Sequence, residues 1–267
     1  MRVQGIMMIL TAILVLGVMG LVFAGLLGFA ADYFHVEEDP RVGEVLKVLP
    51  GANCGACGLA GCRDYAERLV RGEAQAGACT AGGDKVTMAV ASIMGVEAAC
   101  VERKIATVHC GSKIQQRKPK AHYTGIETCF AVNMVDGGGL ACSYGCLGRG
   151  DCRNACPFDA IRMVDGLPSI DPQKCTACGK CVAACPRKII SLRPENFPVA
   201  VACSSRDAGA VVRKICSVGC IGCKMCVKQA PEVFSVTDNL ASIDYTKTGV
   251  SCDTAIEKCP AKCIVRL

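Results

Sequence analysis

Residues 175–186, CTACGKCVAACP, hold four cysteines in a run that ends in proline. The spacing C-x2-C-x2-C-x3-C-P is typical of iron–sulfur proteins, in which three thiolates bind one [4Fe–4S] cubane and the fourth binds another. The proline then turns the chain away. Because the fourth cysteine needs a second cluster, the run predicts a partner run elsewhere in the chain.

The partner run is residues 142–157, CSYGCLGRGDCRNACP, which ends in the same Cys-Pro pair. A third run, residues 216–231, CSVGCIGCKMCVKQAP, aligns with it residue for residue, and Cys223 then falls opposite Arg149. The partner run has therefore lost the middle cysteine of its triad. Arg149 is expected to donate to a cluster sulfur, to meet an acidic side chain, or to be an ordinary solvated arginine.

Three ligand sets follow from these runs, each with four cysteines. The first combines the intact triad with the crossing cysteine of the partner run: Cys156, Cys175, Cys178 and Cys181. The second takes the nearest cysteine as the replacement for the lost ligand: Cys142, Cys146, Cys152 and Cys185. The third run has Ala230 in place of its crossing cysteine, so it is expected to hold one cluster. Its ligands are Cys220, Cys223, Cys226 and Cys259.

A further group of cysteines lies nearer the N-terminus, in CGACGLAGCRDYAERLVRGEAQAGAC. Its members are Cys54, Cys57, Cys62 and Cys79. Zinc sites usually group their ligands in two separated pairs, so three close thiolates and a distant fourth favour a cubane. Helices are expected from Pro40, after Cys62 as far as Gly72, and over 82–96. This region is therefore predicted to be a small helical module around one cluster.

The N-terminal segment 3–31 carries no charged residue. As a helix it would span roughly 40 Å, enough to cross a bilayer with some tilt. Four glycines in it, at 17, 20, 25 and 28, would let another helix approach closely. A signal peptide has an apolar region about half as long, so we expect an uncleaved anchor. Charges flanking the segment do not decide its orientation, but labile clusters favour a cytoplasmic position for residues 36–267.

Seven cysteines remain outside these sets. Cys110 and Cys203 are related by the repeated motifs VHCGS and VACSS, and Cys142 and Cys216 occupy equivalent places in their runs. The other leftover cysteines have no evident partner: Cys100, Cys129, Cys252 and Cys263. Two alternatives stay open: buried thiols without a ligand role, or a further cluster that would include Cys142.

Composition excludes several other classes of protein. The chain has 267 residues and 23 cysteines, an odd number concentrated in tight runs, which disfavours a disulfide scaffold. The formal charge of +6 would become about −2 once four cubanes are bound, and no basic stripe with aromatic residues suggests nucleic acid. His35, His109 and His122 form no metal or catalytic pattern. With no nucleotide-binding motif either, the chain is expected to carry electrons and to lack a site for an organic substrate.

The predicted fold class is α+β, with an N-terminal transmembrane helix, a small helical [4Fe–4S] module and ferredoxin-like modules. Residues 158–174 between the paired runs predict two strands joined by a turn at Asp165–Gly166. The expected parts are an anchor at 1–35, the helical module at 36–98 and a connecting segment at 99–140. A two-cluster ferredoxin domain follows at 141–195, and a single-cluster module at 196–267.

The order of these parts closely resembles the B subunit of the Rnf complex, an ion-translocating ferredoxin:NAD oxidoreductase. The residues that carry the resemblance are an acidic-Pro junction (EEDP, 37–40), CGACGLAGCRDYAE (54–67), the paired cysteine runs and CSYGCLG (142–148). The extra C-terminal module is similar to the long form found in anaerobes. The resemblance implies an electron-transfer subunit that takes electrons from soluble ferredoxin and passes them to other membrane subunits.

Two alternatives to this interpretation are the polyferredoxin-type subunit of another anaerobic membrane oxidoreductase and a non-redox scaffold that binds zinc. The first cysteine group argues against the former. Basic residues near the intact run are candidates for docking an acidic ferredoxin: Lys174, Lys180, Arg187 and Lys188. Ordinary solvated charge is the competing interpretation of these four side chains.

Overall fold

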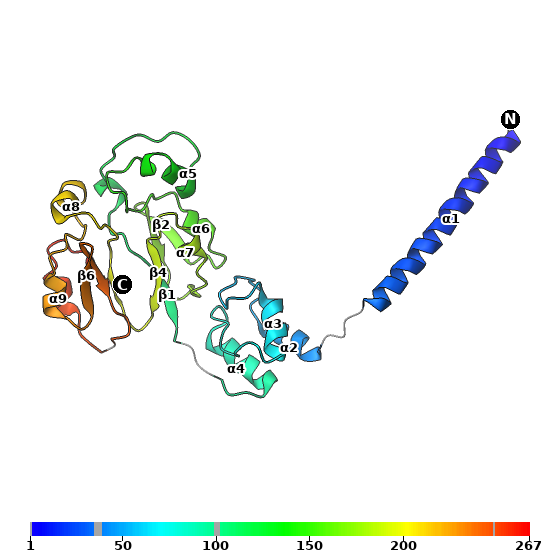
Figure 1. The fold of residues 1–267 in the computed structure, drawn as a ribbon, viewed down its shortest axis with the longest axis horizontal. Coiled ribbons are helices and arrows are strands. Elements are labelled where there is room, and N and C mark those ends of the chain that lie inside the picture. Colours follow the sequence, from blue (N-terminus) through cyan, green and yellow to red (C-terminus); the bar gives the residue numbers. More distant parts are fainter. Residues whose placement is uncertain (1, 35–38, 99–101, 248) are drawn as a thin grey trace. The chain divides into compact units, whose positions relative to one another are not determined.

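The computed structural model describes residues 2–34, 39–98, 102–247 and 249–267. It divides into two compact units, Met1–Pro40 and Arg41–Leu267. Figure 1 follows the chain from the N-terminal helix through a helical module to a part built of short strands and helices.

The first unit is one long helix, α1 (Arg2–Tyr33). Residues Leu10–Tyr33 are long and apolar enough to cross a membrane, and none of that apolar surface is buried within the protein. A helix that is apolar on every side has lipid or other membrane helices as its natural surroundings. The predicted N-terminal apolar helix is confirmed.

The helical module contains α2 (Pro40–Val48), α3 (Cys62–Val70) and α4 (Gly83–Met94). Its core is centred on Val45, Tyr65 and Val90, all at most 1% exposed. Helix α4 ends at Gly95, whose φ of 65° is a left-handed conformation that glycine adopts without penalty. The three helices expected from the sequence are all present.

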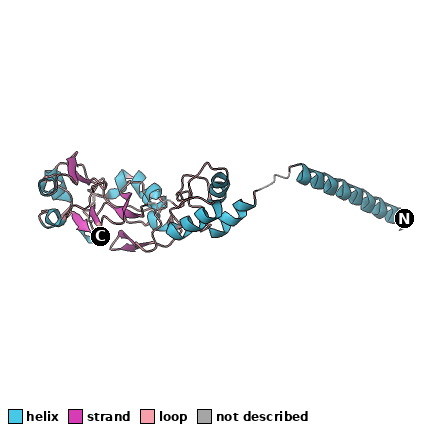
Figure 2. Ribbon diagram, turned by 90° about the horizontal axis from the view of Figure 1, so that it is seen from below, coloured by secondary structure: helices cyan, strands magenta, loops and turns pink. Residues whose placement is uncertain are grey.

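The rest of the chain consists of two copies of one fold, and Figure 2 shows their short strands between short helices. In the first copy β1 (Lys104–Val108) pairs with β4 (Ile190–Pro194), and β2 (Ile161–Val164) pairs with β3 (Leu167–Ile170), both antiparallel. In the second, β5 (Val199–Val201) pairs with β8 (Ile264–Arg266), and β6 (Phe234–Thr237) with β7 (Leu240–Ile243).

Each copy also carries short helices that follow its cysteines. These are α6 (Asp151–Asn154) and α7 (Lys180–Ala184) in the first copy, and α8 (Gly209–Ile215), α9 (Met225–Gln229) and α10 (Asp253–Glu257) in the second. The first copy alone has an insertion that contains η1 (Ile114–Gln116), α5 (Cys129–Met134) and η2 (Asp136–Gly139). The α+β class and the internal repeat are confirmed.

The expected connecting segment, 99–140, is divided by the structure. Its strand β1 pairs along its full length with β4, from Lys104 opposite Pro194 to Val108 opposite Ile190. Residues 104–108 therefore belong to the first ferredoxin-like copy and not to a linker. A five-residue strand of mixed polarity, KIATV, carries little sequence signal, and its pairing partner lies more than 80 residues away.

Candidate iron–sulfur sites

The intact cysteine run forms the first site. Cys156, Cys175, Cys178 and Cys181 line one cavity, together with the β2–β3 hairpin side chain Ile161. Burial, together with the neighbouring sulfurs of the same four-cysteine set, raises the pKa of Cys181 to about 11. The amide of Ala106 on β1 lies 3.5 Å from the Cys175 sulfur and donates to it. The structure thus brings together all four predicted residues.

A left-handed residue precedes the helix at the end of each triad. Gly179 (φ 75°), Gly150 (φ 84°) and Lys224 (φ 59°) cap α7, α6 and α9 respectively, and a cysteine is the second residue of each helix. The cysteine after each turn lines the same cavity as the cysteine six residues before it. The geometry is local, and it is kept at Gly150 although that run lacks the C-x2-C spacing.

The second site differs from the sequence-based ligand set at one position. Its cavity is lined by Cys146, Cys152 and Cys185, as predicted, but its fourth cysteine is Cys129. Burial raises the pKa of Cys152 to about 12, with further contributions from Cys146, Cys129 and Cys185. The predicted fourth ligand, Cys142, lies instead in a separate cavity.

The insertion of the first copy delivers Cys129 to this site. Cys129 is the first residue of α5, and the carboxylate of Asp151 accepts hydrogen bonds from its amide (2.8 Å) and from that of Phe130 (3.0 Å). Arg149 forms an ion pair with Glu127, two residues before Cys129. Of the three roles expected for Arg149, the structure therefore shows the contact with an acidic partner. Arg149, which stands where the middle cysteine was lost, thus holds the segment that carries Cys129.

The sequence contained one signal that pointed to Cys129. The insertion between 113 and 141 occurs only in the copy that has lost its middle triad cysteine, and Cys129 is the one cysteine within those residues. Cys142 was predicted to replace the lost middle cysteine because it is the nearest remaining cysteine in sequence. A ligand carried by a long insertion can reach the site without being close to the other ligands in sequence.

The third site lies in the C-terminal copy. Cys220, Cys223, Cys226 and Cys259 line one cavity, as predicted, and Cys263 lines it as well. The sulfurs of Cys259 and Cys263 lie 3.6 Å apart, and this hydrogen bond lowers the pKa of Cys259 to about 5. Cys223 is exposed, while the other cysteines of this cavity are buried. Cys252 is buried in the neighbouring core, and Cys100 lies outside the described residues.

The fourth site is in the helical module. Burial raises the pKa of Cys79, and the nearby sulfurs of Cys62, Cys54 and Cys57 raise it further, so the four predicted thiols interact. The side chain of Asn53 accepts a hydrogen bond from the amide of Cys62 (2.8 Å), where α3 begins. A β-carbon at Gly61 would lie 2.7 Å from that Asn53 oxygen, so a larger residue there would displace the Asn53 side chain that closes the loop.

Tyr65 supports this module from within. Its hydroxyl donates one shared hydrogen bond to the carbonyl oxygens of Gln75 (2.9 Å) and Ala76 (2.8 Å). Both carbonyls lie on the segment that leads to Cys79. Tyr65→Phe is expected to lower the free energy of unfolding by about 1–3 kcal/mol, because buried carbonyls lose their donor. Chemical denaturation of the holoprotein measures this loss.

The same hydroxyl makes the stability of the module depend on pH. Burial, with the nearby Cys79 and Cys57, raises the pKa of Tyr65 to about 12 from its ordinary value of 10. Above pH 10 the unfolded chain loses this proton while the folded protein keeps it, so stability falls between pH 10 and 12. Tyr65→Phe should remove that part of the decline, and equal slopes in both proteins would contradict the assignment.

The four sites fit cubanes by donor type and by spacing. Within the ranges that the structure describes, no group of three His, Cys, Asp or Glu side chains converges on a position for a single metal ion. Each cysteine of a cubane site binds a different iron, so its four sulfurs stand around a cluster and not around one ion. Three of the sites are cavities lined by at least four cysteines, as [4Fe–4S] clusters require.

Three family models match the same parts of the chain. Residues 49–81 match a putative Fe–S cluster domain, 141–186 a 4Fe–4S dicluster domain, and 217–265 a 4Fe–4S single-cluster domain of ferredoxin I. Together with the apolar helix, these sites define an iron–sulfur protein with several [4Fe–4S] domains and one candidate membrane-spanning helix.

Curated relatives narrow the class further. The chain is 46% identical to the B subunit of the Na(+)-translocating ferredoxin:NAD(+) oxidoreductase complex of Acetobacterium woodii, over 96% of this chain and 77% of that protein. It is 40% identical to the B subunit of the proton-translocating complex of Clostridium ljungdahlii (96% and 92%). It is 37% identical to the B subunit of the ion-translocating oxidoreductase complex of Methanosarcina acetivorans (96% and 97%). The chain belongs to the family of Rnf complex B subunits, and the resemblance noted in its sequence is confirmed.

Proposed function

We propose that this chain accepts electrons from reduced ferredoxin and relays them through its cubanes to membrane partners of an ion-translocating complex. The observation that carries the proposal is the series of four-thiol sites in a chain of the Rnf B family. The chain supplies thiolates, backbone donors and packing, and the clusters supply one-electron chemistry when bound.

The proposed ligand sets keep most of the assignments made from the sequence. The helical module holds one cluster on Cys54, Cys57, Cys62 and Cys79, and the C-terminal copy holds one on Cys220, Cys223, Cys226 and Cys259. The central copy holds two, on Cys156, Cys175, Cys178 and Cys181 and on Cys129, Cys146, Cys152 and Cys185. Cys129 takes the place first given to Cys142, because it shares the cavity of the other three.

The cluster-bearing part is proposed to lie on the cytoplasmic side of the membrane, with α1 as a single-pass anchor. Cubanes with partly exposed cysteines, such as Cys223, are best preserved in a reducing compartment. The reduced ferredoxin that supplies the electrons is also a soluble partner, so its docking surface must face the same compartment.

Three lysines near the first site form the proposed ferredoxin-docking patch: Lys174, Lys180 and Lys188. Lys174 and Lys188 are exposed, and Lys180 is partly so. Arg187, the fourth residue expected from the sequence, donates a hydrogen bond to the carbonyl of Gly137 and is partly buried, which lowers its pKa. It is therefore a structural residue and is left out of the patch.

Reversing the charge of the docking patch (Lys174→Glu, Lys180→Glu, Lys188→Glu) is expected to slow reduction by ferredoxin. Positive side chains steer an acidic partner, so the second-order rate constant should fall about tenfold or more at low ionic strength and much less at high salt. Stopped-flow reduction of the complete complex by ferredoxin measures this rate.

A matched control places three equivalent reversals beside the C-terminal cluster. Lys224, Lys228 and Lys262 are all exposed near the cavity that holds Cys223. Their reversal should leave the rate within about twofold of the wild-type value, since charges distant from the docking surface are screened. If reduction by ferredoxin were slow in the C-terminal variant and fast in the docking-patch variant, electrons would enter at the C-terminal copy instead.

A further inference from the structure

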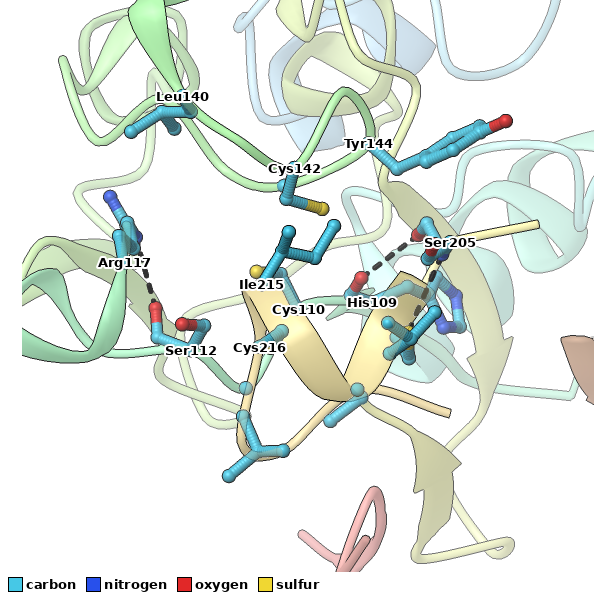
Figure 3. A pocket seen from close by; sticks show the side chains of 18 of the residues that line it. His109, Cys110, Ser112, Arg117, Leu140, Cys142, Tyr144, Ser205, Ile215 and Cys216 are labelled. Carbon is cyan, nitrogen blue, oxygen red and sulfur yellow. Dashed lines mark hydrogen bonds between the residues drawn. The ribbon is translucent and has the colours of Figure 1, made fainter. Parts of the chain in front are cut away.

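A cavity outside the four sites is lined by four more cysteines, Cys110, Cys142, Cys203 and Cys216. Figure 3 shows Cys110, Cys142 and Cys216 around this space, together with Arg117 and His109. The cavity has a volume of about 40 Å³, against about 20 Å³ in each of the first three sites. Room for a centre of similar size is therefore present.

The internal repeat explains why four thiols meet there. Cys110 follows β1 and Cys203 follows β5, the equivalent strand of the second copy, while Cys142 and Cys216 open the equivalent cysteine runs. Each copy thus contributes two cysteines from matching positions. The first gap of the run at 142–157, between Cys142 and Cys146, has the same origin, because Cys142 belongs to this cavity and not to the triad.

Direct contacts hold the two cysteine-bearing loops together. The amide of Gly111 donates to the carbonyl of Ala202 (3.0 Å), and the hydroxyl of Ser204 donates to the carbonyl of His109 (2.8 Å). A β-carbon on Gly111 would lie 3.2 Å from that of Ala202, so small residues allow this approach. The loops are therefore fixed against each other next to Cys110 and Cys203.

Hydrogen-bond donors already point at these sulfurs. The Cys110 sulfur accepts from the amide of Cys146 (3.4 Å), and the Cys203 sulfur accepts from the amides of Ser205 (3.4 Å) and Cys220. The Cys142 sulfur accepts from the amides of Tyr144 and Gly145. Amide donors stabilise thiolates and are the usual surroundings of cluster sulfurs.

We propose that Cys110, Cys142, Cys203 and Cys216 hold an additional [4Fe–4S] cluster between the two ferredoxin-like copies. Arg117 and Lys118 line the same cavity and offset the charge of the four thiolates. The site shares its lining by four cysteines with the cavities of the first and second sites.

The additional cluster would connect the clusters of the two copies. Cys146, whose amide donates to Cys110, belongs to the second site, and Cys220, whose amide donates to Cys203, belongs to the C-terminal site. One hydrogen bond therefore links this site to a ligand of the cluster on either side. In each transfer the neighbouring cluster that gives the electron would go from 1+ to 2+, and the additional cluster would go from 2+ to 1+. The additional cluster would then return to 2+ by reducing the cluster on its other side from 2+ to 1+.

Native mass spectrometry of the anaerobically prepared full chain should count five clusters, with about 20 irons and 20 sulfides. The variant Cys110→Ala/Cys203→Ala should lose about four of each, one fifth of the total, and keep the other clusters. Cys252→Ala is the matched control, because Cys252 is buried in the C-terminal core yet lines none of the cavities described above. It should retain the full content.

A wild-type count of four clusters, or zinc bound in place of iron at this site, would overturn the proposal. Cys142→Ala/Cys216→Ala offers a second variant, which removes the other two thiols of the cavity and should lose the same cluster. Its retention of all five clusters would also count against the site. The number of clusters in the wild-type protein does not depend on whether any variant folds. It is also independent of whether ferredoxin is the electron donor.

Discussion

Cys129→Ala is expected to remove one complete cubane from the central ferredoxin-like copy, a loss of about four irons and four sulfides per chain. The physical reason is that Cys129 shares a buried cavity with Cys146, Cys152 and Cys185, and three thiolates leave one iron without a protein ligand. Iron and sulfide analysis of the purified protein, with electron paramagnetic resonance after reduction, measures the loss.

Double variants with Cys185→Ala distinguish Cys129 from Cys142. Cys129→Ala combined with Cys185→Ala should lose no more iron than Cys185→Ala alone, because both remove ligands of one cluster. Cys142→Ala combined with Cys185→Ala should lose about four further irons, since these two cysteines line different cavities. The opposite pattern would restore Cys142 to the set predicted from the sequence.

Deleting residues 1–40 is expected to release the protein from the membrane almost completely while its clusters remain. The apolar helix α1 is the candidate span of the described chain, and Arg41–Leu267 forms a separate compact unit. Each apolar side chain near the centre of a spanning helix contributes a few tenths of a kcal/mol to insertion, so about 20 of them dominate the partition. Ultracentrifugation with iron analysis of both fractions gives the result.

A companion variant separates anchoring from specific helix contacts. A β-carbon at Gly17, Gly20, Gly25 or Gly28 would meet nothing within 4 Å beyond the nearby helix backbone, so leucine at these four positions should leave the helix itself intact. Membrane association should persist, but assembly with partner subunits should fall if these glycines permit close helix packing. A truncated chain that stays in the membrane fraction would refute the anchoring role of α1.

Most of the local features were predictable because they depend on residues close together in sequence. The triads with their capping turns at Gly179 and Lys224 follow from C-x2-C spacing, and the long apolar stretch predicted α1. The crossing ligand Cys156 was also predictable, since the Cys-Pro pair belongs to a recurrent two-cluster pattern.

The places where prediction from sequence failed involve ligands or strands supplied from a distance. Nothing in the order of residues shows that an insertion folds back to bring Cys129 beside Cys152, with Arg149 and Glu127 holding it there. The pairing of β1 with β4 is likewise invisible along the chain, because a short apolar strand has no partner until the fold exists.

The sequence by itself determined the class of cofactor, the number of repeated modules and the apolar helix, since each depends on spacing or composition over a few residues. Only the tertiary structure decided which cysteines share a cavity: Cys142 leaves its own run to meet Cys110, Cys203 and Cys216 across the two copies. The reason is that a cubane accepts any four thiols that packing brings around it, and backbone contacts between distant loops, such as Gly111 against Ala202, set those positions.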